Sequence, residues 1–235
     1  MSSCRRIVPI LITTFFLSAL WPPRIAPAAG EHSLHQGFVY VADIAPDILF
    51  DLRYCGVDNF MGVKVDGYRV PVAILSAPAA AALKKANETA LSQGYVIKIF
   101  DAYRPRTAVD HFVRWSKDKD DLKNKKRFYP DIDKPDLFGK GFIAARSGHS
   151  RGSTVDVTLV DRATGTELDM GSPFDFFGPA SRHGTRLITP EQAANRTLLK
   201  TVMQKNGFRP YANEWWHYTL AHEPYPDRYF DFPVQ

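Results

Sequence analysis

The sequence has 235 residues, of which 45% are hydrophobic and 23% are charged. This length allows one domain of fair size or two small ones, and the composition excludes a chain that is disordered throughout. The formal net charge of +5 is carried partly by the N-terminal segment. It therefore gives little support for nucleic-acid binding, and we expect no nucleic-acid partner.

The first 28 residues have the pattern of a secretory signal peptide. Arg5 and Arg6 precede an apolar run, and small residues follow at Ala26 and Ala28. The run is shorter than the about 20 residues that a membrane-spanning helix needs, so we expect cleavage after Ala28 and no stable membrane span afterwards. We therefore expect an exported protein, periplasmic or secreted.

The remaining chain, residues 29–235, is expected to form a single domain, because it contains neither an internal repeat nor a low-complexity linker. It keeps 27 basic and 25 acidic residues and one cysteine, Cys55, since Cys4 is removed with the signal peptide. An internal disulfide is thereby excluded. An exported protein without disulfides depends for stability on its core, or on a bound metal.

The first half of this domain begins with residues 38–54, whose β-branched and aromatic residues predict strand and loop. A helix is predicted over residues 76–94, where Ser76 can cap the start, a proline suits the first turn and a glycine ends it. A strand over 95–100 and a helix over 106–122 follow. The alternation of types is irregular and the strands are short.

The second half begins with the charge-dense residues 117–136, which we predict to be a solvated loop. A strand is predicted to start near Thr154, and a helix over 189–208 carries Thr189 as its cap. Residues 213–220 are aromatic and strand-like. The whole pattern favours an α+β fold with a small central antiparallel sheet flanked by helices, rather than a doubly wound parallel sheet.

The residues best suited to chemistry begin in the stretch SGHSRGSTVD. Loop-forming residues separate His149 from Asp156, so a loop that ends where a strand begins can aim both side chains at one centre. Alone, such a pair is seldom a metal site. His217 in EWWHY offers a third ligand and Glu214 a carboxylate, which together match a catalytic zinc site with a general base.

Two further features of the sequence have two interpretations each, and the spacing of Glu214 and His217 sets a geometric condition. Arg104 in DAYRP is either a surface arginine or a group that stabilises an oxyanion. Trp215 and Trp216 either pack in the core or form a wall of the site. Glu214 and His217 are three residues apart and would face opposite sides of a regular strand, so the chain must bend there if both reach one metal.

These motifs together resemble a known family. SGHSRGSTVD resembles the SxHxxGxAxD motif of the zinc D-alanyl-D-alanine peptidases, and EWWHY is similar to their ExxH element. The stretches FDLRYCGVDNFMG, DAYRP, LDMGSPFDFF and GFRPYANEWWHY resemble the dipeptidase branch, the VanX-type enzymes of peptidase family M15. The resemblance runs in order from Phe50 to Tyr218. Thr154 is a departure, because the family usually has alanine there.

The resemblance implies a fold, a metal and a reaction. The fold is that of the D-Ala-D-Ala zinc peptidases (hedgehog/DD-peptidase-like). One zinc ion per chain is expected on His149, Asp156 and His217, with Glu214 as general base and Arg104 stabilising the transition state.

The expected reaction is hydrolysis of the small dipeptide D-alanyl-D-alanine in a small, closed pocket. Asp175 and Tyr54 are implied to lie near the substrate ammonium, which as a buried cation suits a carboxylate partner. Ser147 is implied to hydrogen-bond the substrate. Because the enzyme is expected to be exported, its role would be cell-wall turnover or D-alanine scavenging rather than glycopeptide resistance. The oligomeric state is left open.

Two alternatives remain at this point. A D,D-carboxypeptidase acting on peptidoglycan stem peptides would share every zinc ligand, although the dipeptidase-type segments 50–62 and 168–177 argue against it. A non-catalytic peptidoglycan-binding module would need neither Glu214 nor Arg104, since binding alone requires no base.

Overall fold

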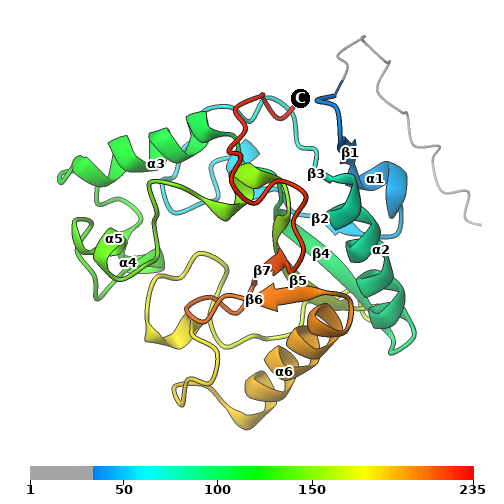
Figure 1. The fold of residues 1–235 in the computed structure, drawn as a ribbon. Helices are drawn as coiled ribbons and strands as arrows, with labels where there is room; N and C mark the ends of the chain where they lie inside the picture. The colour runs from blue at the N-terminus through cyan, green and yellow to red at the C-terminus, as the bar shows by residue number, and fades with distance from the viewer. Residues whose placement is uncertain (1–33) are drawn as a thin grey trace, which may run out of the picture. The chain divides into compact units, whose positions relative to one another are not determined.

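The computed structural model describes residues 34–235, which form one compact unit; the expected signal peptide lies outside them. Two sheets organise this unit (Figure 1). The small one pairs β1 (Phe38–Tyr40) with β3 (Ile74–Ser76). The large one has five strands in the order β2-β4-β5-β7-β6. These strands are β2 (Leu49–Phe50), β4 (Tyr95–Asp101), β5 (Thr154–Asp161), β6 (Phe208–Pro210) and β7 (His217–Leu220).

The large sheet is antiparallel except at one edge, where β2 runs parallel to β4. The α+β class and the mainly antiparallel sheet predicted from the sequence are therefore confirmed. β5 is the central strand, and seven of its eight residues are buried. A strand buried on both faces holds its polar side chains in a dry, fixed environment, which is what a rigid site needs.

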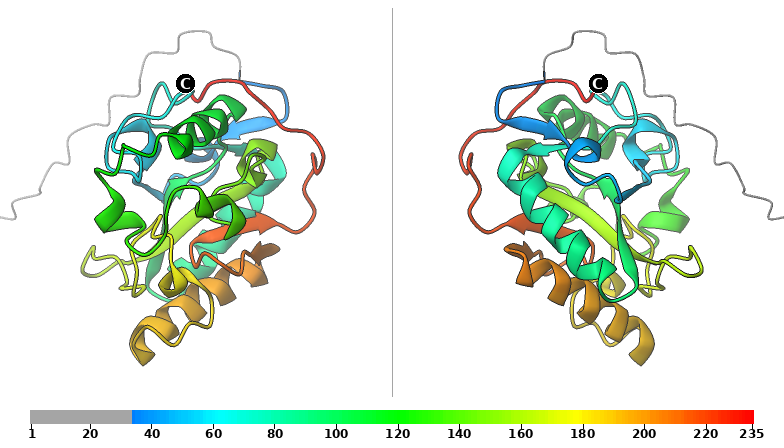
Figure 2. Two further views of the ribbon diagram at one scale, coloured as in Figure 1. Left: turned by 90° about the vertical axis from the view of Figure 1, so that its left-hand side faces the viewer. Right: turned by 90° about the vertical axis from the view of Figure 1, so that its right-hand side faces the viewer.

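Two long helices, α2 (Ala77–Leu91) and α6 (Pro190–Lys205), lie on one side of the large sheet (Figure 2). Thr189 caps α6 through a capping box with Gln192, as the sequence predicts for the cap. Ser76 occupies the cap position of α2, but its hydroxyl makes no capping bond there. Instead it pairs with the Ser153 hydroxyl at 2.8 Å, which joins the start of α2 to the start of β5.

The other side of the sheet carries α3 (Arg106–Lys117) and a segment with two short helices, as Figures 1 and 2 show. The remaining helical elements are α1 (Val41–Ile44), α4 (Lys125–Phe128), α5 (Asp136–Gly139), and the 3-10 turns η1 (Arg53–Cys55), η2 (Gly148–Arg151) and η3 (Pro179–Ser181). Within residues 34–235, no helix combines the length and apolar character needed to cross a membrane.

The prediction of a solvated loop over residues 117–136 is wrong in its central part. Phe128 and Tyr129 are buried, and the Tyr129 ring packs edge-on against Trp115 with centroids 5.5 Å apart. Lys134 is buried too, with its ammonium donating to the backbone carbonyls of Trp115 and Asp118. The high density of charges in this segment favoured the prediction of a solvated loop, although a few of its apolar side chains pack into the core beside α3.

Candidate active site

Pairing between strands places three polar residues side by side. Asp156 on β5 lies directly opposite Asp101 on β4 and opposite His217 on β7. Cross-strand partners point to the same face of a sheet, so the three side chains converge. A register shift between Ile99 and Asp101 re-aims the end of β4 just before this point.

The loop between the predicted ligands brings His149 into the same group. His149 lies in η2, and its Nδ1 contacts the Ala102 carbonyl at 2.7 Å, so Nδ1–H donates and Nε2 is left free to coordinate. Gly152 ends η2 with φ at 79°, where an added Cβ would lie 2.1 Å from Phe38. Only glycine fits this turn, which lies between the two candidate ligands.

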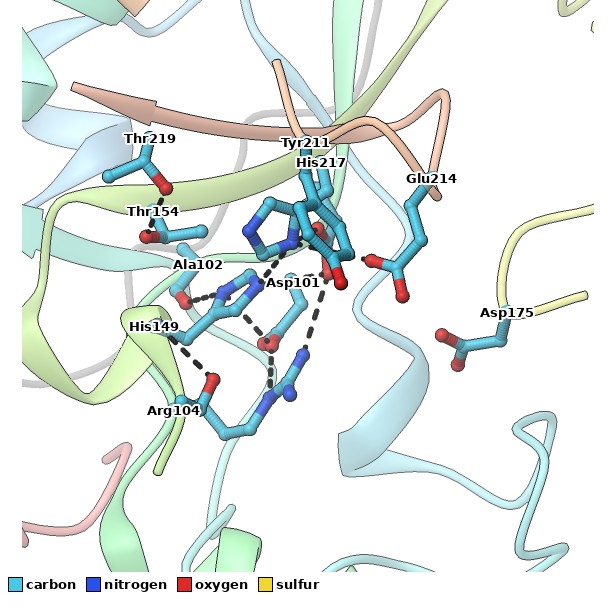
Figure 3. A network of polar contacts seen from close by, with 12 residues as sticks. Asp101, Ala102, Arg104, His149, Thr154, Asp175, Tyr211, Glu214, His217 and Thr219 are labelled. Carbon is cyan, nitrogen blue, oxygen red and sulfur yellow. Dashed lines mark hydrogen bonds and ion pairs between the residues drawn. The ribbon is translucent and has the colours of Figure 1, made fainter. Parts of the chain in front are cut away.

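The three candidate ligands match the requirements of a metal site. The atoms that His149, Asp156 and His217 offer lie within 4.8 Å of one another. His149 Nε2 is 3.3 Å from His217 Nδ1 (Figure 3). His149 Nε2 is also 3.3 Å from one Asp156 oxygen, and His217 Nδ1 is 3.1 Å from the other. Ligands at about 2.0–2.1 Å from a tetrahedral zinc lie roughly 3.3 Å apart, so these residues fit that ion.

Glu214 lies beside this group and is largely buried. One of its carboxylate oxygens is 3.5 Å from His217 Nδ1. Glu214 sits in a turn just before β7, so the bend that the spacing requires is made outside the strand. Burial raises the pKa of the Glu214 carboxyl well above its usual range, and the charges of Asp156 and Asp175 raise it further.

Arg104 reaches the same centre from the end of β4. Its Nε donates to Asp101 at 2.9 Å, and its Nη2 lies 3.5 Å from Asp156. The guanidinium also lies over the rings of Tyr54 and Phe112, at 5.0 and 5.1 Å from their centroids. Arg104 is thus a fixed, partly buried cation rather than a surface arginine.

At the far side of Glu214, as Figure 3 shows, lies Asp175. It is buried, and the Tyr54 hydroxyl donates to its two oxygens at 3.0 and 3.2 Å. Burial raises the pKa of the Asp175 carboxyl well above its usual range, followed in effect by the Asp156 charge. Its backbone has φ at 61°, which is rare outside glycine and costs about 1–3 kcal/mol at a functional site.

These groups line one small cavity. Its volume is about 260 Å³, below the roughly 300–1,000 Å³ of pockets for drug-sized ligands. The predicted site residues all border it: Tyr54, Arg104, Ser147, His149, Asp156, Asp175, Glu214 and His217. Trp216 is part of the wall, whereas the indole of Trp215 points elsewhere and donates to Ser172.

Thr154 does not border the cavity. Its hydroxyl pairs with that of Thr219, its partner on β7, at 2.8 Å (Figure 3). Threonine is therefore accommodated at this position by a second threonine on the neighbouring strand, and it does not crowd the ligand atoms.

Sequence reasoning missed two residues of the site. Asp101 was not singled out, although a carboxylate ending a buried strand beside an arginine is a usable signal. Besides Arg104 it accepts a hydrogen bond from Tyr68 at 2.6 Å. Tyr211 lies against the His217 ring, with centroids 5.5 Å apart; it stands within the stretch GFRPYANEWWHY but was assigned no role there.

Comparison with known proteins assigns the chain to one family. The family model described as D-ala-D-ala dipeptidase (Peptidase_M15) matches residues 34–235. A D-alanyl-D-alanine dipeptidase of Streptomyces coelicolor is 45% identical over 84% of this chain and 98% of that protein. Proteins of the same name from Enterococcus faecium and Escherichia coli are 42% and 32% identical, over 85% and 77% of this chain and 98% and 83% of theirs.

A solved structure of the LdcB LD-carboxypeptidase covers 82% of this chain and 72% of its own, with a TM-score of 0.42 and 18% identity, which is too weak to carry an argument. The family match and the near full-length relatives are decisive. The chain belongs to the D-alanyl-D-alanine dipeptidase family of the M15 peptidases.

Proposed function

We propose that this protein is a zinc-dependent D,D-dipeptidase that hydrolyses D-alanyl-D-alanine to two molecules of D-alanine. The observation that carries the proposal is the convergence of a His-Asp-His group, Glu214 and Arg104 in a small cavity that also holds the buried Asp175. The relatives at 42–45% identity, which are named D-alanyl-D-alanine dipeptidase, support the same substrate.

One zinc ion per chain would be held by His149, Asp156 and His217. When bound, zinc supplies a Lewis acid that polarises the scissile carbonyl and lowers the pKa of water. Glu214 accepts a proton from the attacking water and passes it to the leaving amine as the peptide C–N bond breaks. Arg104 stabilises the negative charge that develops on the carbonyl oxygen.

Asp175 and Tyr54 bind the free amino group of the dipeptide. A buried carboxylate needs a charged or hydrogen-bonding partner, and the substrate ammonium provides one. The Tyr54 hydroxyl holds the Asp175 carboxylate in place through both oxygens. The ammonium favours the ionised form of Asp175 and so offsets the effect of burial on its pKa.

The same residue argues against a D,D-carboxypeptidase. An N-acylated stem peptide has no ammonium at this position, so binding it would leave Asp175 buried beside a neutral amide. The small cavity volume points in the same direction. A non-catalytic binding module is disfavoured because it would have no use for Glu214 beside the ligands.

A substrate panel on zinc-loaded protein tests the proposal. We expect rapid cleavage of free D-Ala-D-Ala and little of an N-acetylated peptide ending in D-Ala-D-Ala. Glu214→Gln should retain zinc and lose at least about a hundredfold in kcat, whereas Glu191→Gln on the exposed first turn of α6 should change neither. Faster cleavage of the acylated peptide would establish the carboxypeptidase instead.

We also propose that the enzyme is exported and acts in cell-wall turnover or D-alanine scavenging. Support comes from the sequence of residues 1–28, whose basic start, apolar run and small residues suit a signal peptide. An exported enzyme meets only dipeptide released from the wall or supplied from outside. Cell fractionation tests this: active enzyme in the cytoplasm with residues 1–28 retained would refute it.

A further inference from the structure

The proposed substrate has two charged ends, and only one has been matched so far. D-Ala-D-Ala carries an ammonium at one end and a carboxylate at the other. Asp175 with Tyr54 suits the ammonium. The carboxylate also needs donors when it enters a cavity, because an unpaired charge is costly to remove from water. The inference below rests on the proposed function and concerns the partner of this carboxylate.

The cavity wall, as far as residues 34–235 form it, carries two guanidinium groups, those of Arg104 and Arg146. Arg104 is already engaged with Asp101 and Asp156 and lies at the reacting centre. It cannot also pair with the far end of the dipeptide without leaving these two buried carboxylates.

Arg146 is free to take that role. It is exposed, and its guanidinium carbon lies 5.0 Å from the centroid of the Tyr229 ring. Arg146 also borders a neighbouring cavity of about 410 Å³, whose wall includes Arg106 and Arg228. The wall of that cavity also includes Asp110 and Asp227, but no ion pair of Arg146 with a carboxylate forms within residues 34–235. Arg146 therefore stands at the boundary between the site and its surroundings.

The next residue adds a second donor at the same end. The Ser147 hydroxyl oxygen accepts a hydrogen bond from the His149 backbone N–H at 3.3 Å, which leaves its own hydrogen free to donate. Arg146 and Ser147 immediately precede η2 and so enter the cavity from the side of His149. Asp175 lies on the far side of Glu214 from His149 (Figure 3), so the Asp175 carboxylate is separated by Glu214 from the segment that leads into His149.

The segment that bears Arg146 is held in place at its start. The Tyr211 hydroxyl donates to the Gly141 carbonyl at 2.9 Å, and Asn213 lies 3.4 Å from the Lys140 carbonyl. Gly141 has φ at 78°, and a Cβ there would lie 2.8 Å from the Tyr211 hydroxyl. These contacts hold the segment against the turn that carries Glu214, so the positions of Arg146 and Glu214 are fixed relative to each other.

We propose that Arg146 binds the C-terminal carboxylate of the dipeptide, with the Ser147 hydroxyl as a second donor. Arg146 is then a specificity-determining residue that selects a free carboxylate and fixes the length of the substrate at that end. A guanidinium suits this task because its planar donors match a carboxylate in a bidentate pair.

The test compares D-Ala-D-Ala with D-alanyl-D-alaninamide, which lacks the carboxylate. For Arg146→Gln we expect kcat/KM to fall about tenfold to a hundredfold on the dipeptide, mainly through KM, and to change less than twofold on the amide. Where the amide is not cleaved, its inhibition constant against D-Ala-D-Ala gives the same comparison. Arg146→Lys should recover part of the loss, because it keeps the charge without the planar donors.

Arg228→Gln is the matched control, since Arg228 is also exposed and borders only the neighbouring cavity. It should leave both substrates unaffected, and zinc content should be unchanged in every variant. If Arg146→Gln lowers kcat/KM equally on D-Ala-D-Ala and on the amide, or does not lower it on D-Ala-D-Ala, Arg146 does not bind the carboxylate. The proposed function would stand in that case. A wild-type protein inactive on D-Ala-D-Ala would instead overturn the proposed function, and this inference with it.

Discussion

The close approach of Gly148 to Thr154 predicts that Gly148→Ala destabilises the protein, and that the loss of stability depends on the Thr154 side chain. A Cβ added to Gly148 would lie 2.9 Å from Thr154 Oγ1, closer than real Cβ contacts allow. The backbone itself tolerates alanine, because Gly148 is not among the residues with positive φ. The Thr154 hydroxyl cannot simply turn away, since it is bonded to Thr219 at 2.8 Å.

The magnitude follows from these contacts. If the hydroxyl turns away, a hydrogen bond worth about 1 kcal/mol is broken; if it stays, a methyl group is forced into a packed site, which typically costs ~1–3 kcal/mol. We therefore expect Gly148→Ala to lower the free energy of unfolding by ~1–3 kcal/mol. Because Gly148 directly precedes His149, we also expect weaker metal binding. In a Thr154→Ala background the obstacle is gone, and the same change should cost less than ~1 kcal/mol.

Four proteins complete the measurement: wild type, each single variant and the double variant. Denaturant unfolding gives the stabilities, and competition with a chelator gives the zinc affinities. The coupling energy between the two sites should be ~1–2 kcal/mol. Gly139→Ala is the control, because a Cβ at Gly139 meets nothing within 4 Å. If the effects of the two substitutions are additive, the Thr154 hydroxyl is not the obstacle to a side chain at position 148.

Three further predictions concern the metal, its loop and pH. Chelation of zinc should abolish turnover and stoichiometric zinc should restore it; activity that persists in metal-free protein would contradict the proposed chemistry. Arg151→Gln removes a bidentate pair with Glu223 at 2.7 and 2.8 Å, which braces the loop between two ligands. It should weaken zinc binding about tenfold while kcat of the reloaded enzyme stays within twofold, and an unchanged zinc affinity would argue against it. Burial, followed by the charges of Lys200 and Arg196, lowers the pKa of His183 to about 4. The unfolded chain therefore takes up this proton first, and the free energy of unfolding should fall as pH drops from about 6.5 towards 4. His183→Gln should flatten that dependence, and an equally steep fall in the variant would show that other groups cause it.

The elements whose signals are local could be predicted from the sequence. The helix α6 and its Thr189 cap follow from neighbouring residues, as does the start of β5 at Thr154. The candidate ligands and base were also found in the sequence, because SGHSRGSTVD and EWWHY contain the residue types that zinc chemistry uses and resemble the motifs of a known family. In the helix and its cap the atoms that interact are only a few residues apart, so spacing alone predicts the contact.

The way in which these parts meet could not be predicted from the sequence and is seen in the folded structure. The register of β5 against both of its neighbours puts Asp156 beside Asp101 and His217, and Tyr54 meets Asp175 from 121 residues away. The buried aromatic residues within the charged segment 117–136 were equally hidden. Such contacts depend on pairing and packing between segments distant in the chain, and strand register is set by the whole buried face rather than by any local pattern.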